Sequence, residues 1–178
     1  MNPLDQYDRY YFLHPGQLII TKDYVPIVTI LGSCVAVTIH SPDTGLSGIF
    51  HAMLPEHRIK KQVIAGHPPV SPDAEYVDFA FYYLKHRFSE SGISLRNTTL
   101  MLFGGSDVLK TVNAPKMETV GRQNILMAKK IFESEMIKPV CEDTGGTNGR
   151  KIVFLPHEGK AYVHYLDNDL GNFEELCR

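Results

Sequence analysis

The strongest constraint on the fold of this chain is a β-hairpin predicted between residues 35 and 53. Apolar and β-branched residues predict one strand over Val35–His40 and a returning strand over Leu46–Met53. The intervening segment Ser41–Gly45 reads Ser-Pro-Asp-Thr-Gly, which is the composition of a turn. Two adjacent antiparallel strands are therefore expected in the first third of the chain.

The hairpin register decides which side chains meet. If His40 pairs with Leu46, then Cys34, directly before the hairpin, faces Ala52. A shift of one residue, which a five-residue loop with a bulge permits, places Cys34 opposite His51. Side chains directly opposite one another have Cβ atoms about 4.5–5.5 Å apart. The sequence thus predicts that Cys34 and His51 approach each other.

The remaining pattern predicts an α+β domain of layered, mixed sheets, with residues 1–178 forming one domain. Further strands are expected at Gln17–Thr21, Val25–Leu31, Thr98–Phe103, Ile137–Cys141, Lys151–Leu155 and Ala161–Leu166. Ser71-Pro72-Asp73 is expected to begin a helix that Gly92 ends. Its inward face carries Tyr76, Phe79, Ala80, Tyr83 and Leu84. A second helix is expected over Arg122–Glu135, with Ile125, Met127, Ala128, Ile131 and Phe132 inward.

Composition narrows the class of protein. The chain has 178 residues, a net charge of −2 and no long basic run, so nothing favours binding to nucleic acid. No stretch approaches the roughly 18 apolar residues of a membrane helix, and the N-terminus lacks the layout of a signal peptide. Three cysteines without a secretory signal predict reduced thiols in the cytoplasm.

Cys34 and His51 are also the strongest candidates for chemistry. A thiol with an imidazole in reach is the minimum set for nucleophilic acyl chemistry, although a cysteine in an apolar strand is commonly a small core residue. Gly32 and Ser33 predict a tight turn whose backbone N–H groups can face an oxyanion. Thr29, at the end of the preceding strand, is placed to orient the imidazole.

Other candidate sites are weaker. Cys141 has His157 sixteen residues later, but Asp143–Arg150 between them is glycine-rich and predicts a flexible loop, so Cys141 is expected to be buried. Cys177 lacks such surroundings. Gly104-Gly105-Ser106-Asp107-Val108 resembles a nucleophile elbow without its second glycine. No metal-binding spacing occurs among the eight histidines, and no cofactor is expected.

Several separated motifs resemble the CheD family of chemoreceptor glutamine deamidases. They are Pro15-Gly16, Thr29–Val37, Gly48–Pro55, Tyr76–Ala80, Phe103-Gly104-Gly105, Gly121 with Asn124, and Asp143–Arg150. The resemblance covers the chain from Pro15 to the last strand. In two places the chain differs: Ser106 stands where many members have alanine, and Gln123 where many have arginine, which bears on local packing or a partner surface.

The resemblance implies a four-layer α/β/β/α sandwich similar to the catalytic domain of cytotoxic necrotizing factor, and a triad of Cys34, His51 and Thr29. The substrates would be glutamines of methyl-accepting chemotaxis receptors, and a CheC-type CheY-phosphate phosphatase would be a partner. In the expected mechanism, His51 takes the thiol proton of Cys34. The resulting thiolate attacks the carboxamide and forms a thioester.

Two alternatives remain open. In the first, the chain is a non-catalytic chemotaxis adaptor, which binds either receptors or a CheC-type phosphatase. In the second, it is a cysteine amidohydrolase or acyltransferase that acts on another substrate.

Overall fold

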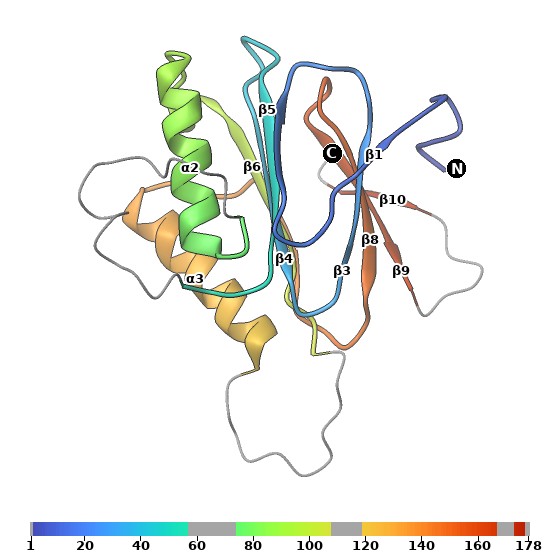
Figure 1. The fold of residues 1–178 in the computed structure, drawn as a ribbon, viewed down its shortest axis with the longest axis vertical. Helices are drawn as coiled ribbons and strands as arrows, with labels where there is room; N and C mark the ends of the chain where they lie inside the picture. The colour runs from blue at the N-terminus through green and yellow to red at the C-terminus, as the bar shows by residue number, and fades with distance from the viewer. Residues whose placement is uncertain (1, 57–73, 108–118, 167–172, 177–178) are drawn as a thin grey trace.

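The part of the chain that the structure describes forms two stacked β-sheets, and two helices cover one outer face of the stack (Figure 1). The computed structural model describes residues 2–56, 74–107, 119–166 and 173–176. Its elements in chain order are β1 (Tyr11–Phe12), β2 (Leu18–Thr21), β3 (Ile27–Leu31), β4 (Val35–His40), β5 (Ser47–Ala52), α2 (Val77–Glu90), the 3₁₀ turn η1 (Leu95–Asn97), β6 (Thr99–Gly104), α3 (Val120–Ser134), β7 (Cys141–Thr144), β8 (Arg150–Leu155), β9 (Lys160–Tyr165) and β10 (Glu174–Leu176).

Both sheets have five strands and mixed pairing, so the predicted α+β class with mixed sheets is confirmed. The hairpin sheet has the strand order β2-β5-β4-β6-β7, and the second sheet has the order β1-β3-β8-β9-β10. The pairs β6–β7 and β1–β3 are parallel, and the other pairs are antiparallel.

Side chains along β4 and β5 alternate between the two faces of the sheet, so the hydrophobic core has two parts. Val37 and Phe50 belong to the cluster beneath the helices, whereas Ala36 and Ile49 belong to the cluster between the sheets. A Cβ atom added to Gly48 would lie 2.9 Å from the Leu84 side chain, so this glycine lets α2 pack directly on β5. Residues two positions from Ala36 or Ile49 therefore face the space between the sheets.

The described residues form three layers rather than four. Both described helices lie against the hairpin sheet (Figure 1). On the outer face of the second sheet, Val28, Val153 and Leu155 are covered by Leu4 and Tyr7 of the N-terminal segment. In this part of the chain no helix supplies the outer layer that a four-layer α/β/β/α sandwich requires.

The first helix begins later than predicted. Ala74 and Tyr76 form isolated bridges with Gly16 and Leu54, which hold the chain extended up to the start of α2 at Val77. The expected cap Ser71-Pro72-Asp73 lies outside the described residues. The end of α2 agrees with prediction, because Gly92 adopts a φ of +74° just after the helix.

The strand predicted at Ile137–Cys141 is wrong in its bounds. Ile137 donates its backbone N–H to Phe132 O at 2.9 Å, so this residue still belongs to the turn that closes α3. Pairing with β6 begins only around Val140, whose N–H donates to Leu100 O at 2.8 Å. The ladder with β6 consequently runs from Cys141 to Thr144.

Candidate functional site

The β4–β5 hairpin has neither of the two registers predicted from the sequence. His40 pairs with Ser47, Ala36 pairs with His51, and Val35 pairs with Ala52. The cause is the turn, in which Ser41 N–H also donates to Leu46 O at 2.9 Å and adds a pair beyond the predicted end of the strand. Cys34 is therefore not directly opposite His51 or Ala52.

Cys34 and His51 nevertheless lie on the same face of the hairpin sheet. Because His51 is directly opposite Ala36, Cys34 is its diagonal neighbour, and such residues are about 7–8 Å apart at their Cα atoms. Cys34 packs against the cluster between the sheets and stays partly exposed, whereas His51 is 1% exposed. Cys34 as a residue is therefore not fully buried.

The second sheet supplies a hydrogen bond that sets the tautomer of His51. Thr29, on β3, places its Oγ1 2.7 Å from His51 Nδ1 and 2.8 Å from Leu13 O. A carbonyl oxygen can only accept, so the single hydroxyl proton of Thr29 points to Leu13. Thr29 Oγ1 must then accept from His51 Nδ1–H, which leaves Nε2 of the neutral ring with a free lone pair.

Nε2 of His51 is buried and has no hydrogen-bond partner among the described residues, Cys34 included. Burial lowers the pKa of His51 from 6.5 to about 4. The Leu13 carbonyl opposes this shift, and the neighbouring charge of His14 adds to it. At neutral pH the imidazole is therefore an uncharged base.

The environment of Cys34 also favours its neutral form. Burial raises the pKa of the Cys34 thiol, and a hydrogen bond from its own backbone N–H opposes the rise. The expected resting thiolate–imidazolium pair is therefore not favoured, because burial penalises charge on both side chains. At neutral pH these shifts favour the neutral thiol of Cys34 and the neutral imidazole of His51.

The turn before Cys34 is held by backbone contacts from the end of β6. Gly105 N–H donates to Cys34 O at 2.8 Å, and Ser106 N–H donates to Gly32 O at 2.8 Å. Among the backbone–backbone hydrogen bonds that the described residues make outside helices and strand ladders, none is donated by Gly32, Ser33 or Cys34. These are the N–H groups that the sequence predicts for an oxyanion.

The predicted loop Asp143–Arg150 is shorter in the structure, because Asp143 and Thr144 belong to β7 and Arg150 begins β8, and Arg150 anchors it. Arg150 is 1% exposed and donates to Asp143 Oδ1 at 2.5 Å, to Ser106 Oγ at 2.8 Å, and to Gly145 O. Ser106 Oγ in turn donates to Asn148 O at 2.7 Å. This buried network contacts the turn before Cys34, because Ser106 N–H also donates to Gly32 O.

Sequence reasoning assigned no role in the site to Arg150, Ser106 or Asn124. Asn124 of α3 is fully buried and donates from Nδ2 to Ser33 O and to Met53 O, both at 3.0 Å. The sequence showed Asn124 and Ser106 only as residues in or beside motifs. A single sequence does not indicate which residues they hydrogen-bond.

The cysteines differ in their surroundings. Cys34 is a free thiol, and Cys141, at the start of β7, is half-buried. Cys177 lies outside the described residues.

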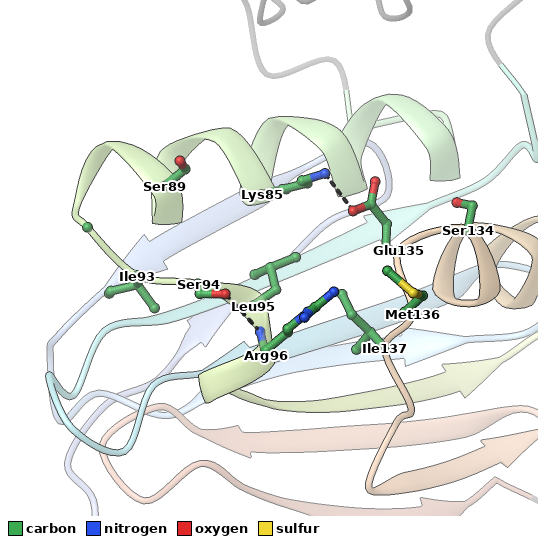
Figure 2. A pocket seen from close by; sticks show the side chains of 11 residues that line it. Lys85, Ser89, Ile93, Ser94, Leu95, Arg96, Ser134, Glu135, Met136 and Ile137 are labelled. Atoms are coloured by element: carbon green, nitrogen blue, oxygen red, sulfur yellow. Dashed lines mark hydrogen bonds and ion pairs between the residues drawn. The ribbon is translucent and has the colours of Figure 1, made fainter.

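A large cavity of about 560 Å³ lies away from these groups, at the C-terminal ends of α2 and α3. Figure 2 shows Lys85 and Glu135 at this cavity, joined by an ion pair of 2.5 Å. Ser134, which also lines it, is ten residues after Asn124, or about 15 Å along the axis of α3. The cavity is therefore not part of the Cys34 site.

The part of the chain that the structure describes contains no group of three or more His, Cys, Asp and Glu side chains arranged to hold a metal ion. None of its helices has the length and apolar character needed to cross a membrane.

Comparison with known proteins then places the chain in a family. Residues 53–165 match the family model described as CheD chemotactic sensory transduction, which is more than half of the chain. The chain belongs to the CheD family. The match begins two residues after His51, so the matched residues do not include Thr29, Cys34 or His51.

Full-length relatives of the CheD family cover those residues. The protein named "Probable chemoreceptor glutamine deamidase CheD" of Nitratidesulfovibrio vulgaris is 32% identical over 89% of this chain and 78% of its own length. A namesake from Maridesulfovibrio salexigens is 31% identical over 94% of this chain and 99% of its own length. The CheD 2 protein of Geobacter sulfurreducens is 31% identical over 88% of this chain and 89% of its own.

Proposed function

We propose that this protein deamidates glutamine side chains of chemoreceptors, releasing ammonia and leaving glutamate. One observation carries the proposal: Thr29 holds His51 with its Nε2 free of any hydrogen-bond partner among the described residues, on the same sheet face as the partly exposed residue Cys34. A neutral base beside a nucleophile is what amide attack requires. The names of the CheD relatives supply the substrate class.

In the first half of the reaction, Cys34 Sγ attacks the carboxamide carbon while His51 Nε2 takes the thiol proton. Because both groups rest neutral, this proton moves as the S–C bond forms rather than beforehand. The backbone N–H groups of Gly32, Ser33 and Cys34 are the nearest candidates to stabilise the oxyanion. Protonated His51 then gives its proton to the departing nitrogen, which leaves as ammonia.

In the second half, water hydrolyses the thioester. His51 Nε2 removes a proton from water, the hydroxide adds to the carbonyl carbon, and the C–S bond breaks. The proton returns to Sγ, so Cys34 and His51 are restored. The net change is glutamine plus water to glutamate plus ammonia, and no cofactor enters the balance.

The deciding experiment uses a purified chemoreceptor signalling domain from the same genome. Ammonia is measured with a coupled enzyme assay, and mass spectrometry locates the amide-to-acid conversion. We expect C34A and H51N to abolish ammonia release while circular dichroism shows them folded. Undiminished release by C34A contradicts the proposal.

The chain offers a matched control for His51. His40 is buried, its Nδ1 lies 2.8 Å from Ser47 Oγ, and that hydroxyl donates to Pro156 O at 2.6 Å. This repeats the imidazole–hydroxyl–carbonyl arrangement of the site without a cysteine. H40N should therefore lose comparable stability to H51N yet retain ammonia release.

A non-catalytic adaptor is favoured by one observation, the raised pKa of Cys34. An adaptor would bind the receptor domain, or a CheC-type phosphatase, without releasing ammonia. Co-sedimentation with the receptor alongside the ammonia assay separates the two functions. The CheC-type partner, the four-layer architecture and the likeness to cytotoxic necrotizing factor remain predictions, which a binding assay and superposition of an experimental structure would test.

A further inference from the structure

The two segments of the site separate where the hairpin ladder ends. Pairing between β4 and β5 stops at Val35 and Ala52. Beyond that point Met53 turns away from β4, because its N–H donates to Glu75 O at 2.8 Å. Cys34, on the other segment, lies just outside the ladder. Strand pairing therefore does not hold the thiol next to the residues that follow His51.

Asn124 joins these separated segments. From α3 its Nδ2 donates to Ser33 O, directly before Cys34, and to Met53 O, two residues after His51. Both distances are 3.0 Å, and the side chain is fully buried. Two carbonyl acceptors can be satisfied only by the NH₂ end of the amide, so its orientation is settled.

The other end of the amide is unsatisfied. Asn124 Oδ1 is buried and has no hydrogen-bond partner among the described residues. A buried acceptor without a partner is unfavourable, and an apolar side chain would avoid that cost. The amide is therefore best explained by its two donated bonds rather than by filling space in the core.

The helix that carries Asn124 is pressed against the same turn by a second contact. A Cβ atom on Gly121 would lie 2.6 Å from Gly105 O, so α3 and the Gly105 backbone touch directly. Gly105 N–H in turn donates to Cys34 O. Asn124 thus acts from a helix that already has a firm position relative to Cys34.

We propose that Asn124 is a positioning residue that sets the spacing between the Cys34 thiol and the His51 imidazole. This inference rests on the proposed function, and it adds a residue to which that function assigns no part. No hydrogen bond joins His51 Nε2 to Cys34 in the free protein, so their spacing depends on the backbone that Asn124 ties together. A misplacement of about 1 Å can slow a reaction on the order of a hundredfold.

The test compares N124A with wild type and with I131A. Ile131 is buried on the same helix about 10 Å further along, in the apolar cluster beneath the helices, so I131A controls for lost stability. The kcat and KM of ammonia release are measured on the receptor domain. Alkylation of Cys34 by iodoacetamide is followed from pH 6 to pH 10 by peptide mass spectrometry (roughly the range over which thiols titrate).

We expect N124A to lower kcat by on the order of 10- to 100-fold with KM nearly unchanged. We also expect its alkylation profile to shift along the pH axis relative to wild type. I131A should keep the wild-type kcat per folded molecule and the wild-type alkylation profile. If N124A does not fold, the isosteric N124D, which removes the NH₂ donors, takes its place.

Wild-type kcat per folded molecule in N124A, or a loss no greater than that of I131A, would overturn the positioning role. If wild-type protein releases no ammonia, the proposed deamidation fails, but the alkylation profiles still decide the role of Asn124. Coincident profiles for N124A and wild type would then overturn it, and a shift confined to N124A would support it.

Discussion

At the scale of single residues, one hydroxyl group determines which nitrogen of His51 can act as a base. Thr29 donates to Leu13 O and accepts from His51 Nδ1, so the imidazole has one available tautomer. Thr29 is uncharged, and it therefore orients the ring without stabilising an imidazolium as a carboxylate would. This agrees with the lowered pKa of His51.

We expect T29V to reduce kcat of ammonia release roughly tenfold to a hundredfold, because the ring loses the acceptor for Nδ1–H. T29S keeps the hydroxyl and should retain most activity. Steady-state kinetics on the receptor domain measures both. S47A breaks the equivalent bond to His40 and, like T29V, should cost about 1–3 kcal/mol of stability. Activity lost equally in S47A would contradict a specific role for Thr29.

At the scale of secondary-structure elements, the end of β6 is the support on which the Cys34 turn rests. Gly105 adopts a φ of +71°, and an added Cβ atom would lie 2.5 Å from the Ile125 side chain and 2.9 Å from Gly121 O. Both neighbours belong to α3. The close approach of α3 to this turn thus depends on two glycines facing each other.

G105A should destabilise the protein by about 2–4 kcal/mol, from backbone strain at positive φ plus the collision with α3. Its activity should fall more than its folded fraction, because the turn that holds Cys34 moves. G45A is the matched control: φ is +69° there and no atom lies within 4 Å of the added Cβ. Chemical denaturation and kinetics on both variants check this; equal effects would show that backbone strain alone is responsible.

At the scale of the whole molecule, stacking the two sheets buries the imidazole of His51. His51 is neutral in the folded protein down to about pH 4, whereas the unfolded chain protonates it near 6.5. Between these values the unfolded state binds more protons, so the free energy of unfolding falls as the pH decreases through this window.

We expect His51 to contribute about 2 kcal/mol to the loss of stability between pH 7 and pH 5. Urea denaturation of wild type and H51Q at pH 7 and at pH 5 measures how much the free energy of unfolding of each protein changes between these two values. The pKa of His40 is also lowered by burial, but this residue is present in both proteins and cancels. Parallel pH dependences would mean that His51 does not titrate as its burial requires.

Local pattern predicted much of the backbone. The bounds of β4 and the end of α2 at Gly92 agree with the sequence, because strand alternation and a left-handed glycine are properties of neighbouring residues. The start of α2 does not agree, since bridges from Gly16 and Leu54 extend the chain there. The residues that support the site were also beyond local pattern: Asn124 reaches Ser33 across 91 positions, and Arg150 reaches Ser106 across 44.

The sequence by itself determined that a cysteine directly precedes one strand of a hairpin and that a histidine stands near the end of its partner strand, because turns and strand period depend on adjacent residues. It placed Thr29 at the end of a strand, whereas Thr29 is in the middle of β3 and reaches His51 from the other sheet. The tertiary structure decided the register, which differs from both predicted pairings, and the charge state of the groups. Packing between the two sheets removes water almost fully from His51 and partly from Cys34, and no single segment carries that information. The same packing brings Asn124 of a distant helix to the carbonyls on either side of the site.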